Sequence, residues 1–311
     1  MTIAKPVLLE AARLALPYRL CDVFTATPFQ GNQLAVFEDA GDLTASEMQK
    51  LANETNLSET TFILRRAHEI ERMEGVRVRI FTTREELPFA GHPTLGTAAT
   101  IRAFFGEYAG AEEVILDLNV GKVPVRFSLD GSQNSGTYGV MTQPKPIFGG
   151  MHDPAEAAQA LGLEVDDLAI DPGPQTVSTG LPYCVVLLRS LEVLGRLQIP
   201  QGEASRYLVS RDARFFYCLA PVSGETATWR ARMQFYSGED PATGSAAGCA
   251  ISYLVRHGLA KSGEQVHLIQ GTEIGRRSDL YVSAERAAGS VDQVKVGGST
   301  TFVAKGHVFL E

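Results

Sequence analysis

The chain has 311 residues, of which 44% are hydrophobic and 21% are charged, as in an ordinary globular protein. Its net charge of -8 and its pI near 5.4 argue against a surface for nucleic acid or for an anionic membrane. No apolar run reaches the length of a transmembrane helix, and four cysteines without a CxxC pair fit reduced thiols in a cytoplasmic protein. We therefore expect a cytoplasmic protein with no nucleic-acid partner and no membrane partner.

Strands dominate the predicted first half. Residues 1–17 are an N-terminal extension, expected as a loose tail or a short helix, in which Glu10 and Arg13 interrupt any signal-peptide core. A helix is predicted over residues 43–56, because Thr44 and Glu47 have the spacing of a capping box, and an apolar helix follows over residues 94–105. The predicted strands are residues 18–24, 33–37, 60–64, 76–81, 114–118 and 122–129, the last two as a hairpin.

A stretch rich in Gly, Pro and Ser, residues 130–152, is the candidate crossover to the second half. Asp153 before Pro154 predicts a helix over residues 154–161, and an apolar helix is predicted over residues 246–257. The predicted strands are residues 183–188, 215–219, 229–236, 266–269, 280–284, 293–297 and 301–309. Strands outnumber helices, and each half has one central helix. This pattern predicts an α+β protein of two pseudo-symmetric domains with antiparallel or mixed sheets, rather than a doubly wound parallel fold.

Two stretches of the chain, 153 residues apart (241 minus 88), share one loop pattern. In each, a β-rich run meets acidic residues, then Pro-x-x-Gly, then small residues that open a helix. The glycines are Gly91 and Gly244. Such a loop directs backbone N–H groups at an anion, and two copies suggest two halves that share one cleft. Since the nucleotide fingerprints GxGxxG and GxxxxGK[ST] are absent, a small carboxylate is the better candidate ligand.

Three polar residues near these loops are candidates for the chemistry. Glu59 lies between a helix end and a strand, where burial would tune it as a general acid or base, although a solvent-facing strand residue fits equally well. His92 directly follows Gly91, and Asp240 directly precedes Pro241. An isolated histidine is more often structural than catalytic, but this one lies within the strongest motif.

Other site types have little support in the sequence. The six histidines show no HxxxH or HxH spacing, so we expect no metal site. No GxSxG elbow is present, which argues against a serine hydrolase. Racemases with two similar halves use two thiols, but the corresponding loop positions here hold Ala90 and Thr243. A two-thiol mechanism is therefore not available.

Several motifs in a fixed order resemble the phenazine-biosynthesis isomerase (PhzF-like) family. The resemblance covers nearly everything from residue 18 to residue 310. It is carried by residues 22–24, 30–36, 56–62, 86–93 and 239–248, with further matching pieces at residues 121–124, 143–144, 178–182 and 270–276.

This resemblance implies a diaminopimelate-epimerase-like fold, in which each domain wraps a sheet round a central helix, and usually a homodimer. The first half would be residues 18–140, which a last strand of residues 301–310 could complete, and the second half would be residues 141–300. The implied activity is cofactor-free: trans-2,3-dihydro-3-hydroxyanthranilate is isomerised to its keto tautomer. A single carboxylate moves the proton.

By the same resemblance, Glu59 matches the catalytic acid/base, and His92 and Asp240 match polar residues around the substrate. The predicted substrate-binding residues are Ser58, Gly91, Gly244 and Ser245, of which the two glycines match backbone turns that hold a carboxylate. Two alternatives stay open. One is an amino-acid epimerase or racemase with His92 or Asp240 as a second base, and the other is a non-catalytic protein that binds a small ligand.

Overall fold

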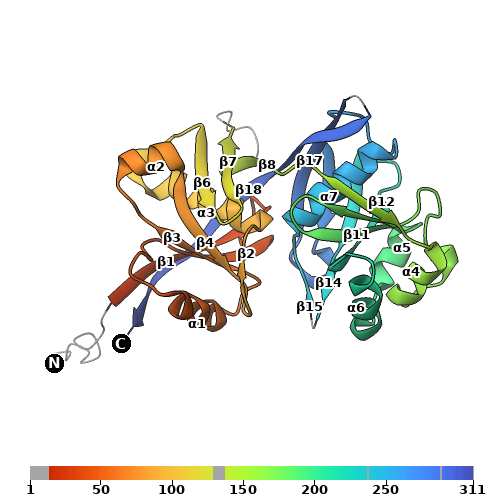
Figure 1. The fold of residues 1–311 in the computed structure, drawn as a ribbon, viewed down its shortest axis with the longest axis horizontal. Coiled ribbons are helices and arrows are strands. Elements are labelled where there is room, and N and C mark those ends of the chain that lie inside the picture. Colours follow the sequence, from red (N-terminus) through yellow and green to blue (C-terminus); the bar gives the residue numbers. More distant parts are fainter. Residues whose placement is uncertain (1–13, 129–136, 237, 288, 311) are drawn as a thin grey trace.

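The computed structural model describes residues 14–128, 137–236, 238–287 and 289–310. Figure 1 shows two lobes, each with strands curving around one long helix. We name the lobes after these helices, α3 (Gly91–Phe104) and α7 (Gly244–Arg256). The predicted α+β class is confirmed. The division into residues 18–140 and 141–300 stays a prediction.

The strands of the α3 lobe form a closed ring. Their order is β1-β2-β3-β4-β6-β7-β8-β18, and β18 also pairs with β1. These strands and the short β5, which pairs with β4, are β1 (Leu14–Val23), β2 (Asn32–Phe37), β3 (Thr60–Leu64), β4 (Val76–Phe81), β5 (Glu86–Leu87), β6 (Glu113–Leu118), β7 (Gly121–Phe127), β8 (Thr137–Thr142) and β18 (Ser290–Leu310). The helices of this lobe are α1 (Ala45–Thr55), α2 (His68–Glu74), α3 and a 3-10 turn, η2 (Gly106–Tyr108).

The strands of the α7 lobe continue the same sheet in the order β18-β17-β16-β13-β12-β11-β10-β9. They are β9 (Ile147–Met151), β10 (Gln175–Ser178), β11 (Pro182–Leu187), β12 (Phe215–Pro221), β13 (Thr228–Arg232), β16 (Val266–Gln270) and β17 (Ser278–Ala287), with a separate pair β14 (Gln234–Phe235) and β15 (Gly238–Glu239). The helices are α4 (Pro154–Leu161), α5 (Leu191–Arg196), α6 (Gln201–Val209), α7 and two 3-10 turns, η3 (Val165–Asp167) and η4 (Thr272–Ile274).

Two segments connect the lobes. The predicted crossover of residues 130–152 contains β8 in one lobe and β9 in the other, while residues 129–136 lie outside the described part. The last strand returns: β18 pairs with β17 and β8 near its start and with β1 from Thr300 to Leu310. The prediction of two strands here, 293–297 and 301–309, was wrong. Gly297 and Gly298 lie within this continuous strand. They leave room for Tyr138 and Phe24, which a Cβ at these positions would meet at 2.8 and 2.4 Å.

The strongest local signals in the sequence are confirmed. Thr44 caps α1, with both hydrogen bonds of the capping box to Glu47, and Asp153 caps α4 before Pro154. The two central helices begin earlier than predicted, at the loop glycines themselves. The first strand also begins earlier, at Leu14 instead of residue 18, because its start pairs with the end of β18.

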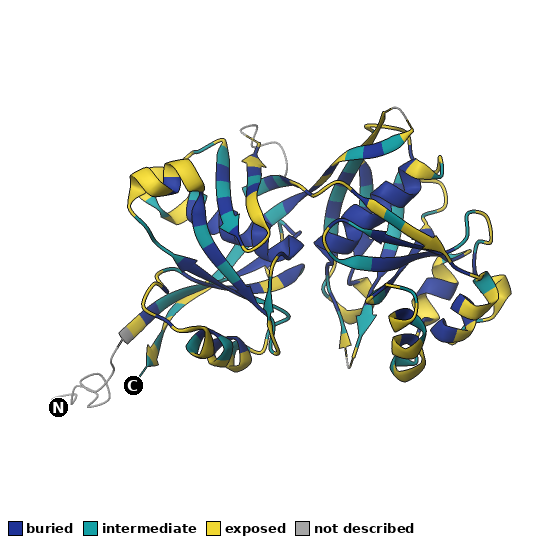
Figure 2. Cartoon of the chain, in the orientation of Figure 1, coloured by how far each residue is buried: buried dark blue, intermediate teal, exposed yellow. Residues whose placement is uncertain are grey.

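Burial explains why the two central helices are so poor in charge. In α3 every residue from Gly91 to Ile101 is buried, and in α7 every residue from Gly244 to Val255 is buried. Figure 2 shows both helices as buried segments inside lobes whose outer helices, such as α2 and α6, are largely exposed. A helix enclosed by a sheet on most sides has no solvent face to carry polar residues, so small and apolar side chains fill it.

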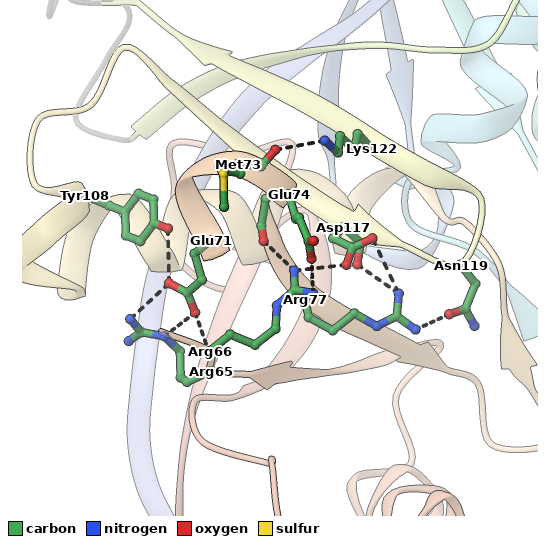
Figure 3. A network of polar contacts seen from close by, with 11 residues as sticks. Arg65, Arg66, Glu71, Met73, Glu74, Arg77, Tyr108, Asp117, Asn119 and Lys122 are labelled. Carbon is green, nitrogen blue, oxygen red and sulfur yellow. Dashed lines mark hydrogen bonds and ion pairs between the residues drawn. The ribbon is translucent and has the colours of Figure 1, made fainter. Parts of the chain in front are cut away.

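Helix α2, which the sequence did not predict, is anchored by a polar network (Figure 3). Its Glu71 is buried and accepts hydrogen bonds from Arg65 Nε at 3.0 Å, from the backbone N–H of Arg66 at 2.9 Å and from the Tyr108 hydroxyl at 3.1 Å. The N-cap residue of α2, Ala67, has no side chain that could cap the helix. The helix therefore carries no start signal in the sequence and depends on these tertiary contacts.

Candidate active site

A cavity of about 290 Å³ lies where residues of the two lobes meet. Its wall comes from the segment before β3, the start of α3, the start of β12, the segment around β14 and β15, and the start of α7. All seven of the predicted site residues line it: Ser58, Glu59, Gly91, His92, Asp240, Gly244 and Ser245. Tertiary structure therefore brings together residues from both halves of the sequence.

The two loop glycines are the closest point between the central helices. A Cβ on Gly91 would lie 2.8 Å from the backbone of Gly244 and from the N atom of Ser245, so only glycine allows this approach. Neither N-cap residue, Ala90 or Thr243, makes a side-chain capping hydrogen bond. The first-turn N–H groups have no acceptor within their own helix, and two positive helix ends thus meet at the cavity wall. This arrangement suits the carboxylate of a small ligand.

Glu59 lies directly before β3, where the chain leaves helix α1. Its side chain is 18% exposed, and it lines the cavity. Burial raises the pKa of Glu59 to about 8, and the neighbouring charge of Asp240 adds to the rise. A carboxyl group that titrates near neutral pH can both accept and return a proton, as a general acid/base must.

Asp240 is more enclosed, with 8% of its surface exposed. Its Oδ1 accepts a hydrogen bond from the Asn32 amide at 2.7 Å, and its Oδ2 accepts one from the Thr243 hydroxyl at 2.7 Å. Burial raises the pKa of Asp240 to about 7, although both hydrogen bonds oppose the rise. The cavity therefore holds two carboxyl groups that titrate close to each other.

His92 is the second residue of α3 and is 4% exposed. Its Nδ1 lies 3.2 Å from the Asn32 amide nitrogen. Its Nε2 is buried without a hydrogen-bond partner among the described residues, and it lies 3.7 Å from Glu59 Oε2. Burial lowers the pKa of His92 to about 3, so the ring is neutral at physiological pH. A buried polar atom without a partner points to a group of the ligand as its missing partner.

Several residues that complete the site were not among the predicted site residues. The hydroxyl of Tyr183 lies 2.8 Å from that of Ser245, and Gln143 donates to the carbonyl of Gly244 at 2.8 Å. Gln270 donates to the carbonyl of Asp240 at 2.8 Å and accepts from the backbone N–H of Thr243 at 3.1 Å. Gln143 and Gln270 occur in motifs of the family resemblance, which was the available signal for them.

Charged residues from both lobes meet at the cavity mouth. Arg214, directly before β12, pairs with Glu85 across the lobes at 2.6 Å. The guanidinium of Arg84 lies over the ring of Tyr236, 4.5 Å from its centre. All four residues line the cavity, but nothing local in the sequence marks them.

The arrangement is suited to proton transfer on a small acid. The positions where a two-thiol racemase would hold cysteines, Ala90 and Thr243, both line the cavity and carry no thiol. The four cysteines are free and buried, and none lines the cavity. Among the described residues, no group of three His, Cys, Asp or Glu side chains is placed to hold a metal ion.

Comparison with known proteins gives a consistent result. The family model described as phenazine biosynthesis-like protein matches residues 21–306. Trans-2,3-dihydro-3-hydroxyanthranilate isomerase of Pseudomonas aeruginosa is 37% identical over 299 residues, which are 94% of this chain and 99% of that protein.

Solved structures agree with the sequence relatives. A predicted epimerase from Pseudomonas aeruginosa is 35% identical, with a TM-score of 0.79 over 94% of this chain and 99% of its own. A phenazine biosynthesis protein from Bacillus anthracis, 24% identical, shares the fold with a TM-score of 0.82 over 95% of this chain and 99% of its own. None of the helices in the described part of the chain has the length and hydropathy needed to cross a bilayer.

Proposed function

This chain belongs to the phenazine biosynthesis-like protein family, and from that membership we propose that it is a cofactor-free isomerase of a small cyclic amino or hydroxy acid. The proposed substrate is trans-2,3-dihydro-3-hydroxyanthranilate, the compound in the name of a relative that is 37% identical to this chain. One carboxyl group, that of Glu59, would move the proton.

The observation that carries this proposal is the position of Glu59. Its carboxyl group faces the cavity with a pKa near 8, and it lies beside the unpartnered Nε2 of His92. In the ionised form Glu59 would take a proton from one carbon of the bound ring. As the acid that this creates, it would return the proton to another carbon on the same face.

The other residues would bind and orient the substrate. The substrate carboxylate would lie at the first turns of α3 and α7, against the N–H groups that follow Gly91 and Gly244, and Ser245 would add a hydroxyl. Neutral His92 would hydrogen-bond a polar group of the ring. Ser58, next to Glu59 in the cavity wall, would add a second hydroxyl. Two helix ends that hold the carboxylate fix the ring relative to Glu59, which lowers the barrier by orientation.

Turnover in deuterium oxide tests this proposal. The protein is incubated with trans-2,3-dihydro-3-hydroxyanthranilate, and product and recovered substrate are analysed by NMR and polarimetry, with Glu59→Gln as the blank. We expect conversion to the keto tautomer by the wild type, while recovered substrate keeps its optical rotation. Loss of rotation together with label at the stereocentre would instead indicate an epimerase. Binding without conversion would indicate a ligand-binding protein.

We also propose a homodimer that acts in the cytoplasm. The family resemblance supports the dimer, and four cysteines that are all free support a reducing compartment. Sedimentation of the purified protein measures the first property. A twofold mass would agree with the proposal, and a monomer at all concentrations would contradict it.

A further inference from the structure

Asn32 is a polar residue that the proposed chemistry does not use. It is the first residue of β2, it belongs to the α3 lobe, and its side chain is buried, with 1% of the residue exposed. Its amide nitrogen donates to Asp240 Oδ1 at 2.7 Å and to the carbonyl of Ala242 at 2.8 Å, both on the segment that leads into α7. A single buried side chain therefore connects the lobes at the site.

The orientation of this amide follows from its partners. Asp240 Oδ1 and the carbonyl oxygen of Ala242 can only accept, so the nitrogen and not the oxygen of Asn32 must face them. The amide oxygen in turn accepts from the Ser58 hydroxyl at 3.3 Å. Each of the two amide hydrogens then has one strong oxygen acceptor.

The surroundings of Asp240 show why this donor matters. Its carboxylate receives hydrogen bonds from the side chains of Asn32 and Thr243, and a backbone hydrogen bond at Ala242 also lowers its pKa. The titratable groups that interact with it, from both lobes, are Glu59, Tyr183, Tyr217 and Glu239, the last paired with Arg232 at 2.6 Å. Neutral His92 lies next to the same Asn32 amide, with its Nδ1 at 3.2 Å. Loss of Asn32 would remove one of these donors from a buried carboxylate.

We propose that Asn32 is a positioning residue that holds Asp240 at the cavity across the lobe boundary and sets how one proton is shared between Asp240 and Glu59. The proposal rests on the proposed function only for its effect on turnover. Asn32 favours the charged form of Asp240, and that charge in turn opposes ionisation of Glu59. The amide thus favours charge on Asp240 and biases the shared proton toward Glu59.

Removal of the Asn32 amide should raise the pH at which the Asp240–Glu59 pair releases its first proton. Without Asn32, ionised Asp240 loses a hydrogen bond, so its pKa rises further and the pair releases its first proton at a higher pH. Because hydrogen bonds to charged groups are about twice as strong as neutral ones, we expect the first step to move up by about one pH unit. Protonated Asp240 no longer opposes ionisation of Glu59, so the acidic limb of the pH profile for kcat/KM, which requires ionised Glu59, moves to lower pH.

Carboxyl titration of Asn32→Ala by ¹³C NMR, without any substrate, tests the proposal. Asp22→Asn is the matched control, because buried Asp22 also joins the lobes, through Arg276 at 2.7 Å, without touching Asp240. We expect the first step of the Asp240–Glu59 pair to rise in Asn32→Ala and to stay at the wild-type pH in Asp22→Asn. No rise in Asn32→Ala, or the same rise in both variants, would overturn the proposal.

Two further measurements keep the test decisive. Asn32→Ser keeps a hydrogen-bond donor on a shorter side chain. In this variant the first deprotonation of the Asp240–Glu59 pair is expected at a pH between those of the wild type and Asn32→Ala. It therefore replaces Asn32→Ala if the alanine variant does not fold. A first step at the wild-type pH in the serine variant would contradict the proposal. If the wild type does not convert the proposed substrate, the substrate assignment fails, and the NMR titration still decides the role of Asn32.

Discussion

The two lobes share one strand pattern but differ in what they bring to the cavity. In the α3 lobe the pairs β1–β2, β2–β3, β3–β4, β4–β6 and β6–β7 run antiparallel, parallel, antiparallel, parallel and antiparallel. In the α7 lobe the pairs β10–β11, β11–β12, β12–β13, β13–β16 and β16–β17 repeat this series. Equivalent positions can therefore be compared directly.

Equivalent positions carry different chemistry. The residue before β3 is Glu59, the proposed acid/base, whereas the residue before the equivalent strand β12 is Arg214, which pairs with Glu85. The residue after the loop glycine is His92 in one lobe and Ser245 in the other. The repeat thus supplies two helix ends that suit one carboxylate, and the differences between the copies supply a single proton-transfer group. This asymmetry favours an enzyme with one base over an epimerase with two matched bases.

The largest effect is expected from the two acids. Glu59→Gln should lower kcat by about 10³-fold, because the acid/base is lost, whereas Asp240→Asn should lower it by about tenfold. Steady-state kinetics with the proposed substrate measures both, and thermal melting checks that each variant is folded. Equal losses in the two variants would mean that the site uses two bases, and the asymmetry would then be wrong.

The next effect concerns an ion pair that occurs once in each lobe, between an Arg and a Glu seven positions further along the chain. Arg232 and Glu239 are buried, each 7% exposed, while Arg79 and Glu86 are 20% and 24% exposed. Arg232→Met should cost about 3 kcal/mol of unfolding free energy, since it leaves a buried carboxylate unpaired. Arg79→Met should cost about 1 kcal/mol or less. Urea unfolding of the two variants compares them, and similar losses would show that burial does not separate the pairs.

A third prediction compares the loss of stability caused by alanine at each of the two loop glycines. A Cβ on Gly91 would meet backbone atoms of Gly244 and Ser245 at 2.8 Å, whereas a Cβ on Gly244 would meet the ring of Phe24 at 3.1 Å and the backbone of Gly91 at 3.2 Å. The shorter contacts force the two helix starts apart, while the longer ones need a shift of only a few tenths of an ångström. Gly91→Ala should therefore cost about 2 kcal/mol and Gly244→Ala about 1 kcal/mol or less. Thermal melting measures the difference, and a larger loss in Gly244→Ala would contradict the close approach.

A fourth prediction concerns the dependence of stability on pH. The pKa values of Glu59 and Asp240 are raised from 4.5 and 3.8 to about 8 and about 7 in the folded protein. At a pH between the unfolded and the folded pKa values, the folded state holds protons that the unfolded chain has released. The free energy of unfolding therefore falls as pH rises toward 8. Glu59→Gln removes one such group and should gain roughly 3 kcal/mol relative to the wild type as pH rises from 5 to 8. A constant difference across this range, measured by urea unfolding, would show that the pKa of Glu59 is not raised.

The sequence by itself determined the fold class, the central helices and the group of candidate residues. These features have local signals: the capping box of Thr44 and Glu47, the repeated Pro-x-x-Gly loop and the alternation of apolar residues in the strands. The family motifs added the match of Glu59 to the catalytic acid/base. Short helices without a cap, such as α2, had no local signal and were not predicted.

Only the tertiary structure decided how these residues act on one another. Asn32 and Asp240 are 208 residues apart in the sequence, yet they form the 2.7 Å contact between the lobes. The neutral ring of His92 and the raised pKa of Glu59 both result from burial, which depends on how the lobes close over the cavity. Local sequence patterns record spacing along one chain segment. Desolvation and hydrogen bonds across the cavity depend on segments that only folding brings together.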